Sequence, residues 1–218
     1  MFYQVPNFID IFLKGCILYI EIQIAFRKDI YMKLTHTMTI AGLKRDLPIC
    51  PVNDSLSIGA FIILGDAELT VACAAELLKI APEYDYLLTS EAKSIPLIHE
   101  MARQSGAKEY FVARKGSKVY MTDPYVATVN SITTAREQHL YLGREDAEKL
   151  RGKRVLIVDD VISTGDSLLA MEKLCELAGA EVCGKMAILA EGEAADRKDI
   201  IFLEKLPLFH SDGSVLED

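Results

Sequence analysis

From about residue 39 onward, the chain alternates between two patterns of apolar and polar residues. Some stretches carry apolar residues at the spacing of an amphipathic helix, and others are short apolar runs typical of buried strands. The predicted helices cover residues 67–80, 95–106 and 166–179, and the predicted strands cover 84–90, 109–114, 153–160 and 181–190. A glycine closes two of these helices, at Gly106 and Gly179.

Strands that alternate with helices predict an α/β fold. Parallel strands need a crossover connection, usually a helix, so successive units build a mainly parallel sheet with helices on both faces. The polar, weakly periodic stretch 115–150 interrupts the alternation. Because such a long stretch is rarely idle in a compact domain, we expect a functional loop there, with or without a hairpin.

The N-terminal part of the chain does not follow this alternation. Residues 8–26 are strongly apolar, but three charged residues interrupt the run, namely Asp10, Lys14 and Glu21. Since a charge is costly within a membrane helix, we do not predict a membrane span. The segment is either an additional packed helix or strand, or sequence upstream of a later start at Met32 or Met38. The second interpretation is favoured.

Composition indicates a soluble globular chain. Half of the 218 residues are hydrophobic and 26% are charged, which is ordinary for a globular domain. We predict an extension over residues 1–38 and one main domain over 39–218. The net charge of −8 argues against a nucleic-acid surface. Five scattered cysteines without a C-x-x-C pair favour reduced thiols in a cytoplasm over disulfides or a zinc site.

The stretch VLIVDDVISTGDS, residues 155–167, leads from a buried strand into a polar turn. Ligands of an open parallel sheet bind beyond the carboxyl ends of its strands, where Asp159 and Asp160 stand. The turn and the following helix N-terminus offer N–H groups and hydroxyls that suit a phosphate. These turn residues are Ser163, Thr164, Gly165, Asp166 and Ser167.

Two carboxylates beside a phosphate cup predict a second binding role. They can accept hydrogen bonds from vicinal hydroxyls, as on a ribose, and can help to hold Mg²⁺ nearby. The stretch therefore predicts a ribose-5-phosphate site, and the alternative is a helix N-cap flanked by solvated acids. The P-loop and dinucleotide-binding glycine motifs do not occur in the chain.

VLIVDDVISTGDS resembles the 5-phosphoribosyl-1-pyrophosphate (PRPP) motif of type I phosphoribosyltransferases. The resemblance implies that Asp159 and Asp160 bind the ribose hydroxyls and that residues 163–167 bind the 5′-phosphate. Asp166 stands where the family often has a second glycine. The resemblance also implies a phosphoribosyltransferase-type sheet with a small N-terminal hood and a flexible lid loop, Mg²⁺ as the cofactor, and a cytoplasmic homodimer.

A second polar turn, in LLTSEAKSIPL at 87–97, resembles the E-A-R-G-type pyrophosphate loop of adenine phosphoribosyltransferases. Lys93 and Ser94 stand at the last two positions of that pattern, and VARKGSK at 112–118 resembles the R-K-P-G-K segment of the same enzymes. The resemblance implies a pyrophosphate site made of Ser90, Glu91, Ala92, Lys93, Arg114, Lys115 and Lys118. Arg114 is also a catalytic candidate, and the alternative for these basic residues is a solvated charged face.

The base site is less clearly marked. The hood is expected over 41–60, where Arg45 and Asp46 could meet the purine edge, and a structural ion pair is an equal alternative. Residues 116–140 are the candidate lid, which would exclude water and prevent hydrolysis of PRPP. Glu137 is a candidate for the lid glutamate of the adenine enzymes, and the alternative is an exposed loop acid.

These features predict a Mg²⁺-dependent purine phosphoribosyltransferase that makes a nucleoside monophosphate and pyrophosphate from PRPP and a free base. Hypoxanthine-guanine enzymes have an aspartate where this chain has Ser163, which favours adenine. Xanthine and orotate are alternative bases. A regulator that senses PRPP without catalysis is the alternative from another class, but residues 1–38 show neither a helix-turn-helix pattern nor a basic charge.

Overall fold

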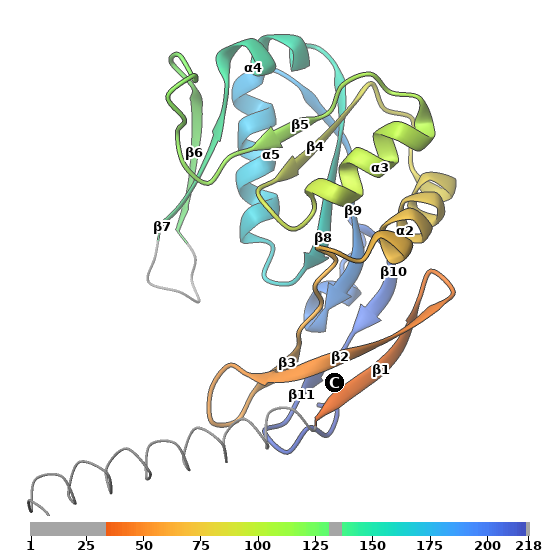
Figure 1. Ribbon diagram of the computed structural model, residues 1–218. Helices are drawn as coiled ribbons and strands as arrows, with labels where there is room; N and C mark the ends of the chain where they lie inside the picture. Colours follow the sequence, from red (N-terminus) through yellow and green to blue (C-terminus); the bar gives the residue numbers. More distant parts are fainter. Residues whose placement is uncertain (1–33, 131–136, 217–218) are drawn as a thin grey trace, which may run out of the picture.

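The computed structural model describes residues 34–130 and 137–216, and a five-stranded sheet forms its centre (Figure 1). The strands are β4 (Tyr86–Ser90), β5 (Phe111–Ala113), β8 (Arg154–Ile162), β9 (Glu181–Glu191) and β10 (Ile201–Leu206). Their order across the sheet is β10-β9-β8-β4-β5, and every neighbouring pair is parallel. The predicted α/β fold with a mainly parallel central sheet is confirmed.

Helices cover both faces of this sheet. They are α2 (Ala67–Ile80), α3 (Ile95–Ser105), α4 (Arg144–Leu150) and α5 (Asp166–Ala178). Side chains of β8 alternate between two cores: Val155 and Ile157 pack with α4 and α5, whereas Leu156 and Val158 pack with α2 and α3. A strand buried on both faces needs a continuous run of apolar residues, so this strand could be predicted from the sequence.

The three predicted helices are present. α2 covers the predicted range, and α3 and α5 each end one residue before the glycine expected to close them. Gly106 and Gly179 adopt φ angles of 78° and 73°, the left-handed conformation that ends many helices.

The long polar stretch contains more regular structure than the sequence indicated. β6 (Tyr125–Asn130) and β7 (Glu137–Leu142) form an antiparallel hairpin, and α4 follows. Ala127, Leu140 and Leu142 are buried in the core beside α5, so the hairpin packs on that helix. Among the side chains of the hairpin that the structure describes, residues 125–128 and 139–142, only these three are buried, which agrees with the weak apolar pattern. The lid loop is not confirmed, because residues 131–136 lie outside the described residues.

A second sheet lies beyond the carboxyl ends of the parallel strands (Figure 1). It is antiparallel and contains β1 (Thr35–Ile40), β2 (Leu43–Pro51), β3 (Ser57–Gly59) and β11 (Leu208–Phe209). This four-stranded sheet includes the predicted hood range 41–60, and β11, from the C-terminal part of the chain, joins it by pairing with β3. The predicted domain boundary after residue 38 falls within β1.

The hood sheet shares a core with the central sheet. Ile40 and Leu47 of the hood pack in one cluster with Leu189 and Leu206 of the parallel sheet. A short 3₁₀ helix, Gly192–Asp196, follows β9. The apolar stretch 8–26 lies outside the described residues, and among the described residues no helix combines the length and apolar character that a membrane crossing needs.

Candidate functional site

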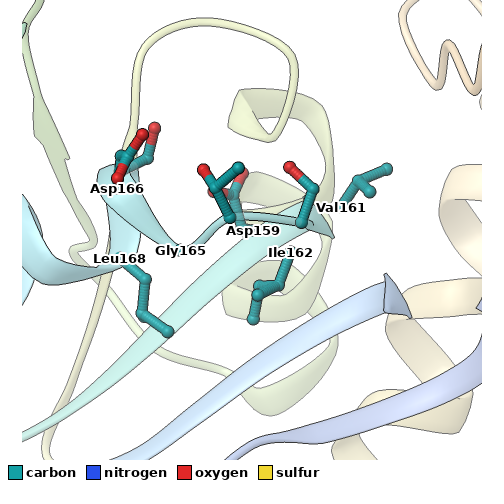
Figure 2. Close-up of a pocket in the computed structure, with 9 residues that line it drawn as sticks. Asp159, Val161, Ile162, Gly165, Asp166 and Leu168 are labelled. Carbon is teal, nitrogen blue, oxygen red and sulfur yellow. The ribbon is translucent and has the colours of Figure 1, made fainter. Parts of the chain in front are cut away.

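The predicted phosphate turn follows β8 directly. Figure 2 shows Gly165 between Asp159 near the end of β8 and Asp166 at the start of α5. Residues of this turn line one hollow, namely Asp159, Val161, Ile162, Ser163, Thr164, Gly165, Asp166, Ser167 and Leu168. The carboxyl end of a parallel strand and the N-terminus of a helix therefore meet at one concave surface, the place where anions bind in open α/β sheets.

Several hydrogen-bond donors of this turn have no protein side-chain partner in the described part of the chain. No side chain caps the first turn of α5, so its leading N–H groups have no side-chain acceptor. In the described part of the chain, the hydroxyls of Ser163, Thr164 and Ser167 make no hydrogen bond with protein groups. Free N–H and O–H donors around one hollow are what a phosphate needs.

The conformation at position 165 favours glycine. Its φ of 85° is a left-handed conformation, and a Cβ there would lie 2.7 Å from Nη1 of Arg197. Two hydrogen bonds to Asp199, of 3.0 and 2.7 Å, hold the Arg197 guanidinium in place. Sequence reasoning did not select Arg197, since its approach to the turn depends on the path of the chain after β9.

The two acids of the motif are buried at the end of β8. Asp159 is 8% exposed and Asp160 is 3% exposed. Burial, with a further contribution from the Asp160 charge, raises the pKa of Asp159 to about 7. Buried like charges oppose folding, and such groups are common at functional sites.

Ser94 holds both acids. Its Oγ lies 2.5 Å from Oδ1 of Asp159 and 3.0 Å from Oδ1 of Asp160, and it accepts a 2.8 Å hydrogen bond from the Asp160 N–H. The sequence pattern marked Ser94 only as the last position of the pyrophosphate-loop resemblance. Its contact with residues 65 and 66 positions away follows from the pairing of β4 with β8, which the pattern did not specify.

The predicted pyrophosphate loop lies beside the acid pair. Nζ of Lys93 is 2.7 Å from Oδ2 of Asp160. One hollow is lined by residues of both motifs: Ser90, Glu91, Ala92, Lys93, Ser94, Lys115, Asp159, Asp160, Val161 and Ser167. The structure therefore brings together the two turns that the sequence placed after separate strands.

Glu91 organises the basic residues around this loop. Its Oε1 lies 2.8 Å from Nη2 of Arg114 and 3.9 Å from Nζ of Lys118, and its Oε2 accepts a 2.9 Å bond from the Lys115 N–H. The Lys115 N–H and the Arg114 guanidinium hold the pKa of Glu91 below its usual range. The three basic residues are therefore gathered at the loop, but Arg114 is already paired.

Arg45 and Asp46 do not reach either hollow. Arg45 Nε pairs with Oδ2 of Asp66 at 2.6 Å and its Nη2 with Oε2 of Glu68 at 2.8 Å, which ties β2 to the start of α2. Asp46 accepts a 2.5 Å hydrogen bond from the Thr37 hydroxyl. The contacts match the structural ion pair, the alternative to a base-edge role. Asp66 and Glu68 were not visible as partners, since they lie 21 and 23 residues away.

Glu137 is the first residue of β7, opposite Asn130 in the hairpin register. Its side chain is outside the part of the chain that the structure describes. A role for Glu137 in handling a base proton therefore stays a prediction.

The acid pair fits a magnesium ion only in part. Carboxylate oxygens are hard ligands that suit Mg²⁺, and Oδ2 of Asp160 has an ion pair with Lys93 but no hydrogen-bond donor among the described residues. Residues 34–130 and 137–216 contain no cluster of three or more His, Cys, Asp or Glu side chains that could hold a metal by itself. A metal here would need further oxygens from a bound ligand.

Two curated proteins resemble parts of this chain in sequence. Adenine phosphoribosyltransferase of Corynebacterium jeikeium (strain K411) is 38% identical over 96 residues, which is 44% of this chain and 44% of that protein. Hypoxanthine/guanine phosphoribosyltransferase of Methanococcus voltae is 32% identical over 119 residues, which is 55% of this chain and 59% of that protein. The chain thus spans about half of the length of these relatives.

A solved structure shares the fold. Adenine phosphoribosyltransferase from Thermoanaerobacter pseudethanolicus superposes with a TM-score of 0.55 at 22% sequence identity, over 82% of this chain and 98% of that chain. The phosphoribosyl transferase domain family matches residues 68–217. Since this range is more than half of the 218 residues and includes both turns, the chain belongs to the phosphoribosyltransferase domain family.

Proposed function

We propose that this chain is a Mg²⁺-dependent purine phosphoribosyltransferase that uses adenine. The observation that carries the proposal is the joining of two turns at one edge of the parallel sheet. The turn after β8 offers free hydrogen-bond donors for a phosphate, and the turn after β4 gathers basic residues. The acids lie between the two turns, in contact with Ser94 and Lys93. PRPP has a phosphate, a ribose and a pyrophosphate in that same order.

Each part of the site then has a role in binding PRPP. Residues 163–167 bind the 5′-phosphate through N–H groups and hydroxyls. Asp159 and Asp160 accept hydrogen bonds from the ribose hydroxyls. The pyrophosphate lies at residues 90–93 with the basic side chains Arg114, Lys115 and Lys118.

The reaction breaks the bond from C1 of the ribose to pyrophosphate and forms a bond from C1 to a nitrogen of the base, which loses a proton. Charge builds up on the departing pyrophosphate while C1 becomes electron-poor, so preorganised cations lower the barrier. Lys93 and Arg114 are held for this task by Asp160 and Glu91, and would exchange these carboxylates for phosphate oxygens. Bound Mg²⁺, held by oxygens of PRPP and by Asp159 and Asp160, would supply further neutralisation of the pyrophosphate.

The choice of adenine rests on two observations. One curated relative is an adenine enzyme, although a hypoxanthine/guanine enzyme also matches. Ser163 stands where the hypoxanthine-guanine enzymes have an aspartate that handles the base proton. Glu137 in the hairpin is the candidate residue for handling the base proton in this chain.

The homodimer and the cytoplasmic location implied by the family resemblance also stay predictions.

The experiment is a panel of adenine, hypoxanthine, guanine, xanthine and orotate, each supplied with PRPP and Mg²⁺, with pyrophosphate release and nucleotide formation measured together. We expect adenine to be consumed with one pyrophosphate released per nucleotide formed. Consumption of another base in its place would correct the substrate and keep the reaction. PRPP binding without consumption of any base would favour a PRPP-sensing regulator over an enzyme.

A further inference from the structure

Ser94 is the residue that connects the two turns of the site through buried hydrogen bonds. It is the N-cap residue of α3, it is 1% exposed, and its hydroxyl makes no cap hydrogen bond within that helix. The side chain instead reaches across to β8, where it contacts both acids. Among the described residues, the other side-chain link between this loop and the acids is the ion pair of Lys93, whose side chain is about half exposed.

The atoms that Ser94 contacts are informative. Both contacts are with Oδ1 atoms, and the Asp160 N–H also donates to Oδ1 of Asp159 at 2.9 Å. In the described part of the chain, no hydrogen bond reaches Oδ2 of either acid. The protein therefore holds Oδ1 of each carboxylate by hydrogen bonds, whereas Oδ2 of Asp160, which is buried, has only the ion pair with Lys93 at 2.7 Å.

A serine hydroxyl has a single proton. It can donate to only one carboxylate at a time, and the 2.5 Å contact favours Asp159 over the 3.0 Å contact with Asp160. Hydrogen bonds from hydroxyls to carboxylates are short and strong. The Asp160 N–H donates to Ser94 Oγ at 2.8 Å, so the hydroxyl also fixes the backbone that carries the second acid.

We propose that Ser94 is a positioning residue for the acid pair: it holds the two Oδ1 atoms, so that Oδ2 of each acid can accept a ribose hydroxyl once Lys93 has exchanged Asp160 for a phosphate oxygen. The inference rests on the proposed function, since it assigns the ligand of the acids as a ribose. It also explains why this chain departs from the E-A-R-G pattern at its last position. Ser94 supplies a hydroxyl at the position where that pattern has a glycine, which has no side chain.

The test compares Ser94→Ala and Ser94→Gly with the wild-type chain in calorimetric titrations with ribose 5-phosphate. Loss of a hydrogen bond to a charged group should weaken binding by about 10- to 100-fold in both variants. Two replacements separate loss of the hydroxyl from any effect of the new side chain, and either one suffices if the other fails to fold. Ser57→Ala is the matched control, because Ser57 is also buried, at 2% exposure, but lies in β3 of the hood.

Steady-state kinetics supply the readout that a merely structural role would not move. The Ser94 variants should raise KM for PRPP about tenfold or more and leave KM for the base unchanged. Simple loss of folded protein would lower the apparent kcat and leave both KM values unaltered. Wild-type affinity for ribose 5-phosphate in both Ser94 variants, or a loss equal to that of Ser57→Ala, would overturn the inference. Failure of the wild-type chain to bind ribose 5-phosphate would instead overturn the proposed function, and the inference with it.

Discussion

The two turns at the edge of the parallel sheet are prepared for a ligand in different ways. The turn after β4 is held by side chains that already have partners: Glu91 with Arg114, Lys93 with Asp160, and Ser94 with both acids. The turn after β8 is shaped by backbone geometry at Gly165, and its hydroxyls are free in the described structure.

This difference indicates how each turn would respond to a ligand. Free donors bind a phosphate without breaking protein contacts, so the turn after β8 should bind ribose 5-phosphate by itself. Paired cations must exchange a carboxylate for a phosphate oxygen, so the turn after β4 should matter most where the pyrophosphate gains charge. The acid pair, at the end of β8, lies directly before one turn and contacts Ser94 and Lys93 of the other.

The largest effect is expected from the acids, because they contact both halves. Asp159→Asn combined with Asp160→Asn should leave the fold intact and lower kcat/KM for PRPP by roughly 10³-fold or more, since the ribose hydroxyls lose charged acceptors and any Mg²⁺ loses anionic oxygen ligands. Circular dichroism checks the fold and initial rates give the loss. Near-normal turnover in the double variant would remove the acids from the mechanism.

The turn after β4 is tested by Arg114→Ala. Loss of one preorganised cation at a developing charge typically costs about 2.7–4 kcal/mol of transition-state stabilisation, by analogy with oxyanion-hole donors. We expect a fall of roughly 10²- to 10³-fold in kcat/KM for PRPP, with an unchanged ranking of bases and unchanged affinity for ribose 5-phosphate.

Arg103→Ala is a suitable control for Arg114→Ala. Arg103 is a nearby basic residue, but it pairs with Glu100 at 2.7 Å within α3. The control should keep wild-type kinetics. If Arg114→Ala changes the preferred base instead, the two halves of the site have been assigned the wrong way round.

The turn after β8 is tested by Gly165→Ala. An alanine would be strained at a φ of 85°, and its Cβ would lie 2.7 Å from Nη1 of Arg197. The hydrogen-bond donors that bind the phosphate should therefore lose their arrangement. Affinity for ribose 5-phosphate and for PRPP should fall together, by about tenfold or more. Gly179→Ala is the control, because Gly179 also has a positive φ, of 73°, but lies at the far end of α5. An equal loss of affinity in both variants would point to general destabilisation.

The smallest expected effect concerns stability and pH in the absence of ligand. The folded pKa of Asp159, about 7, lies above that of an unfolded aspartate, about 3.9. Between these values the folded state binds more protons, so the free energy of unfolding should fall as pH rises from 4 to 7. Asp159→Asn should flatten that slope, as measured by urea unfolding at several pH values. An unchanged slope in the variant would show that Asp159 is not the group responsible.

The parts of the fold that could be predicted from sequence depend on local patterns. β8 and α5 are buried along continuous or periodic apolar positions, and the motif at 155–167 carries its acids, hydroxyls and glycine within one short stretch. The hairpin of β6 and β7 was harder to predict because, among its described side chains, only Ala127, Leu140 and Leu142 are buried. The pairing of β11 with the hood was not predicted, because it joins residues that lie far apart in the sequence, Leu208 and Phe209 with Ile58 and Ser57.

The candidate site divides in the same way. Asp159, Lys93 and Lys115, which the sequence marked as candidate site residues, line the two hollows. The pairing of Ser94 with the acids and the approach of Arg197 to Gly165 depend on which strands are neighbours and on the path after β9. Arg45 was assigned to the base edge as one of two alternatives, and its contacts with Asp66 and Glu68 could be seen only in the folded chain.

In the proposed function, the two turns form one PRPP site with the acids between its halves. The most direct measurement is a crystal structure of the chain with Mg²⁺ and bound PRPP. We expect the 5′-phosphate at residues 163–167, the ribose hydroxyls at Oδ2 of Asp159 and Asp160, and the pyrophosphate at residues 90–93 with Arg114 turned from Glu91 toward it. A 5′-phosphate at residues 90–93, or a PRPP molecule bound away from both turns, would contradict the proposed site.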